Sequence, residues 1–329
     1  MATKRILSGM RPTGKLHLGH LVGALENWVS LQSAYSNYHL IADYHALTTN
    51  LDSSELENNS LEMVIDWLSA GIDPNKSILF RHSQIKEHAE LHLIFSMLIT
   101  TSRLERNPTL KEQVRDLSIE NMSYGHLGYP VLQSADILLY KGEVVPVGDD
   151  QLPHLEITRD IARKFNNQYG KVFPEAEPLI TKFSRLPGLD GGQKMSKSLN
   201  NTILISDNPE NVITKMKSAV TDPLKIKRND PGRPDVCTVF TYHTKFNSKE
   251  EKEIRGGCES GTLGCVECKL KCAAAVSNSI APIVEKRIQL EKSPATIWDI
   301  LNDGETKARK VAEQTMQEVR SKMKLGILK

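Results

Sequence analysis

The chain has 329 residues, of which 39% are hydrophobic and 25% are charged, and its formal net charge is +2. These values are ordinary for a globular protein of about two domains and do not by themselves indicate a nucleic-acid partner. No apolar run approaches the length of a membrane span, and only a brief apolar pair follows Lys4 and Arg5. We therefore expect a cytoplasmic enzyme or binding protein that does not associate with membranes.

The first half of the chain alternates short apolar runs with segments of helical periodicity. Strands are predicted at 4–8, 37–42, 76–81 and 144–147. Helices are predicted at 21–31, 55–70, 88–99, 130–140 and from about 149 to 165. Strands that alternate with helices favour an α/β fold, a parallel sheet with right-handed crossovers.

The second half of the chain carries no strand alternation. Helices are predicted at 211–220, 273–290 and 304–323. We place a domain boundary near 200–208, so that residues 1–205 form the α/β domain and residues 206–329 form a mostly helical C-terminal domain.

A first motif, His17-Leu18-Gly19-His20, follows a turn rich in glycine and proline at 8–14. A strand, a glycine turn and a helix start can together present free backbone N–H groups to a nucleotide phosphate. His17 and His20 are three residues apart, so both imidazoles can face the phosphate and donate an N–H. Gly19 lets adenine and ribose approach the backbone closely.

A second motif, Lys194-Met195-Ser196-Lys197-Ser198, follows the glycine-rich segment 188–192. Its two ammonium groups suit a polyphosphate that gains charge during a reaction, and its serine hydroxyls can add hydrogen bonds. The preceding glycines allow this loop to move between open and closed positions.

Together and in this order, the two motifs resemble the signature pair of class I aminoacyl-tRNA synthetases. Further segments extend the resemblance to bacterial tryptophanyl-tRNA synthetases along nearly the whole chain, at 128–140, 145–151, 221–223 and 228–232. The resemblance implies a Rossmann-like catalytic domain, a helical anticodon-binding domain and a homodimer that charges tRNA(Trp) with L-tryptophan. Tyrosyl-tRNA synthetases share the fold and the signatures, so tyrosine–tRNA ligase activity is the nearest alternative.

The resemblance also implies an ATP site. The catalytic residues would be His17, His20, Lys194 and Lys197, with both lysines holding the β- and γ-phosphates. Residues 148–150 would hold the ribose, and the backbone of Leu186 would touch adenine. The expected ATP-binding set is Met10, Arg11, Pro12, Thr13, Gly19, His20, Gly148, Asp149, Asp150, Leu186, Lys194, Met195, Ser196, Lys197 and Ser198. We expect Mg²⁺ to accompany ATP, held by phosphates and water.

An amino-acid site is predicted on the helix at 130–140. Helical spacing places Tyr129, Gln133, Asp136 and Tyr140 on one face. A carboxylate among apolar neighbours needs a donor, and an indole N–H is a donor only, so Asp136 can recognise tryptophan. The alternative is that Asp136 pairs with a nearby arginine or backbone group. By resemblance, tryptophan would also contact Leu7, His45, Tyr129, Gln133, Val145, Val147 and Gln151.

The implied reaction has two steps and needs no enzyme nucleophile. The carboxylate of tryptophan attacks the α-phosphorus of ATP and pyrophosphate leaves, and the adenylate then esterifies a ribose hydroxyl at the 3′ end of tRNA. Catalysis can come from positioning the substrates and stabilising phosphate charge.

All five cysteines lie between Cys237 and Cys272. In a chain without an export signal, such spacing indicates a metal or redox site more than disulfides. Four thiolates can hold either Zn²⁺ or a 4Fe-4S cluster. The arrangement resembles a subset of tryptophanyl-tRNA synthetases with a 4Fe-4S cluster, which implies Cys237, Cys258, Cys265 and Cys268 as ligands and leaves Cys272 spare. Zinc or a metal-free site are the alternatives.

Two further functional classes are weighed. A synthetase-like paralogue could bind tryptophan or RNA without charging tRNA, and a nucleotidyl transferase of another kind could use the first motif alone. The intact His17, His20, Lys194 and Lys197 disfavour the former, and the second motif with its helical C-terminal domain disfavours the latter. A basic stretch, Lys215, Lys217, Lys225, Lys227 and Arg228, fits contacts to tRNA phosphates or a solvated surface.

Overall fold

A parallel sheet of five strands, in the order β3-β2-β1-β4-β5, forms the centre of the molecule. The computed structural model describes residues 3–116, 119–148, 151–180, 186–192 and 195–326. The strands are β1 (Arg5–Met10), β2 (Ser36–Ile41), β3 (Ser77–Arg81), β4 (Val144–Val147) and β5 (Glu177–Ile180). The predicted parallel α/β fold is confirmed, and β5 is added to the predicted strands.

The strand order reverses at β1. The chain builds β2 and β3 on one side of β1, and then β4 and β5 on the other, with every neighbouring pair parallel. Connections that leave β1 and β4 in opposite directions open a crevice at the carboxyl ends of these strands, where open α/β sheets bind their ligands.

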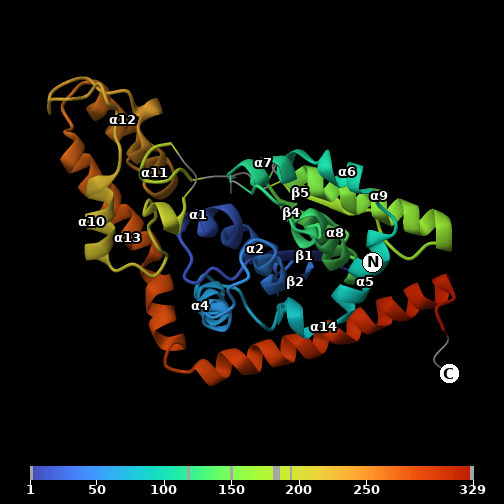
Figure 1. Cartoon of the computed structure of the whole chain (residues 1–329). Coiled ribbons are helices and arrows are strands. Elements are labelled where there is room, and N and C mark those ends of the chain that lie inside the picture. The colour runs from blue at the N-terminus through green and yellow to red at the C-terminus, as the bar shows by residue number, and fades with distance from the viewer. Residues whose placement is uncertain (1–2, 117–118, 149–150, 181–185, 193–194, 327–329) are drawn as a thin grey trace.

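The first nine helices surround this sheet (Figure 1). A π-helical turn at Leu21–Leu25 joins α1 to α2, so the helix predicted at 21–31 already begins at Leu18. The hydroxyl of Ser123 accepts the His126 N–H at 3.1 Å and caps α8, which therefore begins before the predicted residue 130. The helices are α1 (Leu18–His20), α2 (Glu26–Leu31), α3 (Asp43–Leu47), α4 (Leu56–Ser69), α5 (Glu87–Ser96), α6 (Thr101–Glu105), α7 (Pro108–Asp116), α8 (Tyr124–Leu139) and α9 (Leu152–Tyr169).

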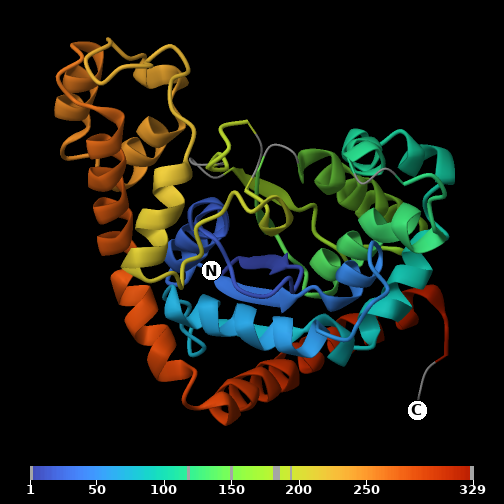
Figure 2. The same cartoon turned by 60° about the vertical axis from the view of Figure 1, so that its left-hand side comes forward.

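The described part of the second half of the chain contains helices and loops without a named strand, as predicted. It contains α10 (Pro209–Ser218), α11 (Thr238–Phe246), α12 (Glu251–Glu259), α13 (Cys265–Leu290) and α14 (Pro294–Met323). Helices α10 to α13 stand to one side of the sheet, and the lower end of α13 packs against α4 (Figures 1 and 2). None of the described helices is long and apolar enough to cross a membrane.

Helix α14 runs back along the α/β half and lies against β3 (Figure 1). Its Gly304 is seated so closely that a Cβ there would lie 1.9 Å from the carbonyl oxygen of Leu79. One position later, Glu305 pairs with Arg81 at 2.6 Å. Glycine is therefore required at this crossing, because any larger residue would push the helix off the strand.

Candidate active site

A cavity of about 380 Å³ lies at the carboxyl ends of β1 and β4, at the point where the strand order reverses. All eight residues that we predicted to contact tryptophan line it, namely Leu7, His45, Tyr129, Gln133, Asp136, Val145, Val147 and Gln151. Met10, Arg11 and Gly148 of the predicted ATP set line it as well. The structure thus brings the predicted amino-acid site and part of the predicted nucleotide site into one cavity.

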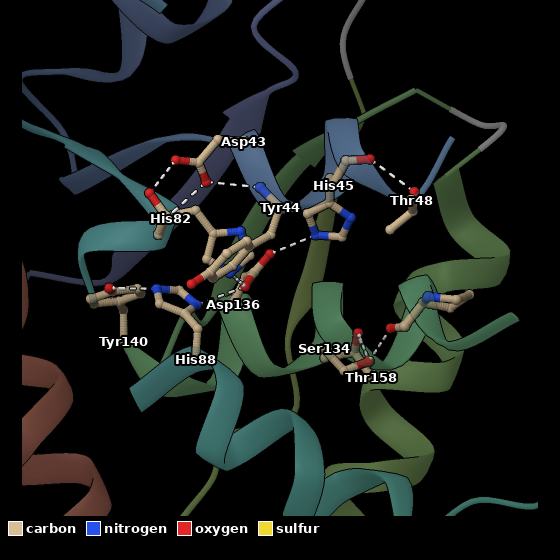
Figure 3. Close-up of polar contacts among 12 residues, drawn as sticks. Asp43, Tyr44, His45, Thr48, His82, His88, Ser134, Asp136, Tyr140 and Thr158 are labelled. Carbon is tan, nitrogen blue, oxygen red and sulfur yellow. Dashed lines mark hydrogen bonds and ion pairs between the residues drawn. The ribbon is translucent and has the colours of Figure 1, made fainter. Parts of the chain in front are cut away.

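Asp136 is the most enclosed polar residue of this cavity, with 2% of its surface exposed. Three imidazoles surround its carboxylate (Figure 3). The Oδ1 atom lies 2.7 Å from His88 Nδ1 and 2.9 Å from His82 Nε2, and Oδ2 lies 2.9 Å from His45 Nε2. Asp136 therefore pairs with histidines, whereas we had considered an arginine or a backbone group.

The electrostatics keep this carboxylate ionised. Burial acts to raise the pKa of Asp136, but the charge of His82 and hydrogen bonds from His45, His82 and His88 hold it well below its usual range. Burial also lowers the pKa of His45, and lowers that of His88 to about 4. The site thus combines an anionic carboxylate with the neutral imidazoles of His45 and His88 at pH 7.

The tautomer of His88 follows from its partners. A carboxylate only accepts hydrogen bonds, so the Nδ1 atom of His88 must carry the proton that it gives to Asp136. Its Nε2 then accepts the O–H of Tyr140 at 2.8 Å. Burial holds the pKa of Tyr140 well above its usual range, so this hydroxyl keeps its proton.

The carboxylate of Asp43 holds two of the histidine-bearing segments together. It lies at the start of α3, which follows β2 and carries His45. It accepts hydrogen bonds from the backbone N–H of Ser83 at 3.0 Å and from the Ser83 hydroxyl at 2.5 Å. Ser83 lies in the 3₁₀ turn His82–Gln84 that follows β3. The ends of β2 and β3 are thereby fixed, and with them His45 and His82.

Tyr129 and Arg11 line the cavity with further polar groups. The hydroxyl of Tyr129 lies 2.6 Å from His154 Nε2, and the other ring nitrogen of His154 lies 3.1 Å from the Asn107 amide. Burial lowers the pKa of Arg11, whose guanidinium donates to the Thr49 hydroxyl at 3.4 Å. Arg11 thus gives the cavity a cation that can attract an anionic substrate group.

The two phosphate motifs meet beside this cavity, outside its lining. The sulfur of Met195 lies 3.2 Å from the Gly19 backbone nitrogen. The ammonium of Lys197 donates to the carbonyl oxygens of Lys15, at 2.9 Å, and Thr13. The rings of His17 and His20 lie 3.8 Å apart, between their centroids. The second motif is therefore seated on the turn that precedes the first.

Several predicted residues have another position. Pro12 and Thr13 do not line the cavity, and Leu186 is buried in a hydrophobic cluster with Leu189 and Met195. Ser196 donates its backbone N–H to the Asn201 side chain at 2.7 Å. Asp149, Asp150, Lys194 and the side chain of Ser198 lie outside the described part of the chain.

The cysteines lie along α11 to α13, away from the cavity. Cys237 precedes α11, Cys258 lies in α12, and Cys265, Cys268 and Cys272 follow one face of α13 or its start. Burial raises the pKa of Cys268 to about 12, and Cys237, Cys258 and Cys265 add to this rise. Within the described ranges, the only three potential ligands with atoms inside 4.8 Å of one another are His45, His82 and Asp136.

A comparison with known families decides which proteins this chain resembles. The model of the class I tRNA synthetases (W and Y) matches residues 2–280. The chain belongs to this family. The parallel sheet and the two motifs are thus those of a class I synthetase.

Close relatives cover almost the whole of this synthetase. The tryptophan–tRNA ligase of Thermotoga maritima is 48% identical, over 98% of this chain and 99% of the relative. That of Aquifex aeolicus is 43% identical, over 98% of this chain and 100% of the relative. A crystal structure of tryptophanyl-tRNA synthetase from Campylobacter jejuni, complexed with ADP and tryptophan, has a TM-score of 0.86 at 36% identity, covering 97% of this chain and 99% of that one.

Sequence reasoning missed part of the synthetase site. His82 and His88 come from two elements other than α8, and nothing in their spacing points to Asp136. Asn27, Trp28 and Gln113 also line the cavity. Asn27 and Trp28 follow the first motif by two to three helical turns, so their position on that helix was the one available signal.

Proposed function

We propose that this synthetase is a tryptophan–tRNA ligase, which forms tryptophanyl-adenylate from L-tryptophan and ATP and transfers it to tRNA(Trp). The observation that carries the proposal is the buried, ionised Asp136 in a cavity that also has apolar walls. An indole N–H can donate to this carboxylate, whereas an analogue without that donor would leave the acceptor unpaired, which costs roughly 10⁴–10⁵-fold in discrimination at such sites. The names of the relatives at 43% and 48% identity support the same substrate.

The amino-acid site accounts for the remaining contacts. Leu7, Val145 and Val147 provide apolar walls for an indole ring, and Tyr129 and Gln133 lie on the same helix as Asp136. Gln151 and His45 complete the set that we assign to tryptophan binding.

We assign ATP to the side of the cavity where the two motifs meet. His17, His20, Lys194 and Lys197 are the proposed catalytic residues, because they can stabilise charge on the leaving pyrophosphate. Arg11 is placed to attract the α-phosphate or the amino-acid carboxylate. The first step forms a bond from carboxylate oxygen to the α-phosphorus and breaks the bond to the β-phosphate. In the second, a tRNA hydroxyl attacks the carbonyl carbon and AMP leaves. Mg²⁺, held by the phosphates and water, would supply further neutralisation of phosphate charge.

We assign catalysis to residues 1–205 and anticodon binding to residues 206–329, and a cytoplasmic location fits the tRNA substrate. Part of the basic stretch is already engaged. Lys225 is 7% exposed and donates to the Asp230 carbonyl, and Lys215 pairs with Asp207 at 2.6 Å. Lys217, Lys227 and Arg228 are exposed and remain the candidates for phosphate contacts.

We further propose a homodimer. Leu93 on α5 and Met97, which directly follows that helix, are 57% and 71% exposed, and Tyr124 at the start of α8 is 69% exposed. Exposed apolar side chains of this size favour a protein interface. Light scattering that reports a monomer at working concentration would contradict this proposal.

We propose a 4Fe-4S cluster on Cys237, Cys258, Cys265 and Cys268. In a tetrahedral zinc site the Zn–S bonds are about 2.3 Å long, so the sulfur atoms lie less than about 4 Å from one another. No three of these cysteine sulfurs, all within the described residues, come within 4.8 Å of one another. A four-iron cluster does not need its cysteine sulfurs to lie that close, because its irons and sulfides lie between the ligands. Its role would be to tie α12 to α13. Anaerobically purified protein without iron or visible absorption would contradict it.

The test of function is amino-acid-dependent exchange of pyrophosphate into ATP, followed by formation of aminoacyl ester on total tRNA. We expect both activities with tryptophan and neither with tyrosine. Asp136→Asn should lower kcat/KM for tryptophan by about 100-fold, since hydrogen bonds to charged groups contribute up to about 3 kcal/mol. Exchange with tyrosine alone would favour a tyrosine–tRNA ligase, and tryptophan binding without exchange would favour a non-charging paralogue.

A further inference from the structure

The two oxygens of Asp136 have unequal surroundings. Oδ1 has two partners, His88 Nδ1 at 2.7 Å and His82 Nε2 at 2.9 Å. Oδ2 has one, His45 Nε2 at 2.9 Å. The His88 contact is a hydrogen bond and the His82 contact is a close approach at ion-pair distance, so two nitrogens crowd Oδ1, whereas Oδ2 has one neighbouring nitrogen and keeps an acceptor position for another donor.

The less occupied oxygen is the one on the cavity side. His45, which contacts Oδ2, lines the cavity, whereas His82 and His88, which contact Oδ1, do not. Both are fully buried behind Asp136, with 0% exposure (Figure 3). A ligand in the cavity therefore meets Oδ2, and it meets an acceptor that can take one more N–H.

We propose that His82 and His88 are positioning residues for amino-acid selection: they fill Oδ1 and hold the carboxylate so that Oδ2 presents its one vacant acceptor to the indole N–H. This inference rests on the proposed function. It assigns selectivity to two residues that do not touch the substrate, and it explains why the site accepts a group with a single donor.

The chemistry of the partners suits this role. An arginine can engage both carboxylate oxygens at once, which would consume the acceptor that the substrate needs. A neutral imidazole donates a single hydrogen bond, from the nitrogen that carries its proton, so one histidine takes one acceptor position. The Tyr140 hydroxyl fixes the tautomer of His88, and the bonds from Ser83 to Asp43 fix the turn that carries His82.

Matched substitutions separate the hydrogen bond from packing. Glutamine and methionine are close in size, but glutamine keeps an N–H donor and methionine has none. We would compare His82→Gln with His82→Met, and His88→Gln with His88→Met. For each variant, pyrophosphate exchange gives kcat/KM for L-tryptophan and for the analogue with benzothiophene in place of indole, which lacks the N–H.

We expect the wild type to prefer tryptophan strongly. Each methionine variant should lower the ratio of tryptophan to analogue by about tenfold, with KM for ATP unchanged, because the lost group acts on the substrate only through Asp136. Each glutamine variant should stay within about threefold of the wild-type ratio. Ser134→Ala is the control, because Ser134 bonds Pro130 and Thr158 on the far side of α8, and its loss should leave the ratio unchanged.

The outcomes are distinct. Equal losses for tryptophan and the analogue, or equal ratios in the glutamine and methionine variants, overturn the positioning role while leaving the proposed function in place. A wild type that exchanges pyrophosphate with another amino acid and not with tryptophan overturns both. If a methionine variant does not fold, the remaining histidine and its pair of variants decide the question.

Discussion

Two buried carboxylates, Asp136 and Asp66, show how one chemical group serves two purposes in this synthetase. Asp136 faces the cavity from α8 and contacts three histidines. Asp66 on α4 is fully buried, pairs with Arg287 of α13, and accepts the backbone N–H of Leu16 at 2.6 Å. Both oxygens of Asp66 contact groups of the protein and Asp66 does not line the cavity, whereas Asp136 lines it and can meet a ligand there.

The surroundings also shift the pKa values of these two carboxyl groups in opposite directions. Burial raises the pKa of Asp66 to about 6, although Arg287 and the Leu16 N–H act to lower it. Burial is outweighed at Asp136, whose pKa lies well below its usual range. A group of donors around one carboxylate therefore keeps it ionised for a ligand more effectively than the ion pair keeps Asp66.

The largest expected effect is a loss of stability when Asp66 loses its ion-pair partner. Arg287 also pairs with Glu62 and, at 2.9 Å, with Glu291. Arg287→Met should lower the free energy of unfolding by about 3–5 kcal/mol, because it leaves a buried carboxylate without its cation. Urea denaturation measures this. Lys141→Met, which removes the exposed pair with Glu318, should cost less than about 1 kcal/mol. If both variants lose the same free energy of unfolding, the buried ion pair contributes no more to stability than the exposed one.

The contribution of Asp66 to the free energy of unfolding should change by about 3 kcal/mol over a pH series. The pKa of Asp66 is about 6 in the folded protein and 3.8 in its ordinary state, so between these values the folded state holds the extra proton. This stabilisation is complete below the ordinary pKa and is lost as pH rises through about 6. The difference in unfolding free energy between wild type and Asp66→Asn should therefore fall over this range. A difference that rises with pH would show that Arg287 lowers the pKa of Asp66 in solution.

The smallest expected effect is on kcat/KM, when the hydrogen-bond chain that ends at Asp136 loses its last member. Tyr140→Phe removes the hydroxyl that donates to His88 Nε2. We expect kcat/KM for tryptophan to fall by at most about tenfold, with KM for ATP unchanged, because the change acts on Asp136 through His88 alone. Steady-state exchange kinetics measure both. A larger effect on ATP than on tryptophan would show that Tyr140 acts through the sheet instead.

The sequence predicted the sheet and the cavity well because both depend on local pattern. Buried parallel strands are apolar runs, and the residues that line the cavity follow those runs or share a helix face. β5 was missed because Glu177 and Pro178 interrupt its apolar character, and α12 because it contains Gly256 and Gly257. His82 and His88 were missed because they come from the turn after β3 and from α5, and only the packing of these elements brings them to Asp136.

The close packing of α14 on β3 protects an edge of the sheet. β3 is the last strand on its side of the sheet, and such a strand is a template onto which another chain can add. With Gly304 against Leu79 and Glu305 on Arg81, the helix occupies the place that an incoming strand would need. Helix α14 thereby blocks aggregation through this edge strand, and Gly304 allows the helix to pack directly against β3.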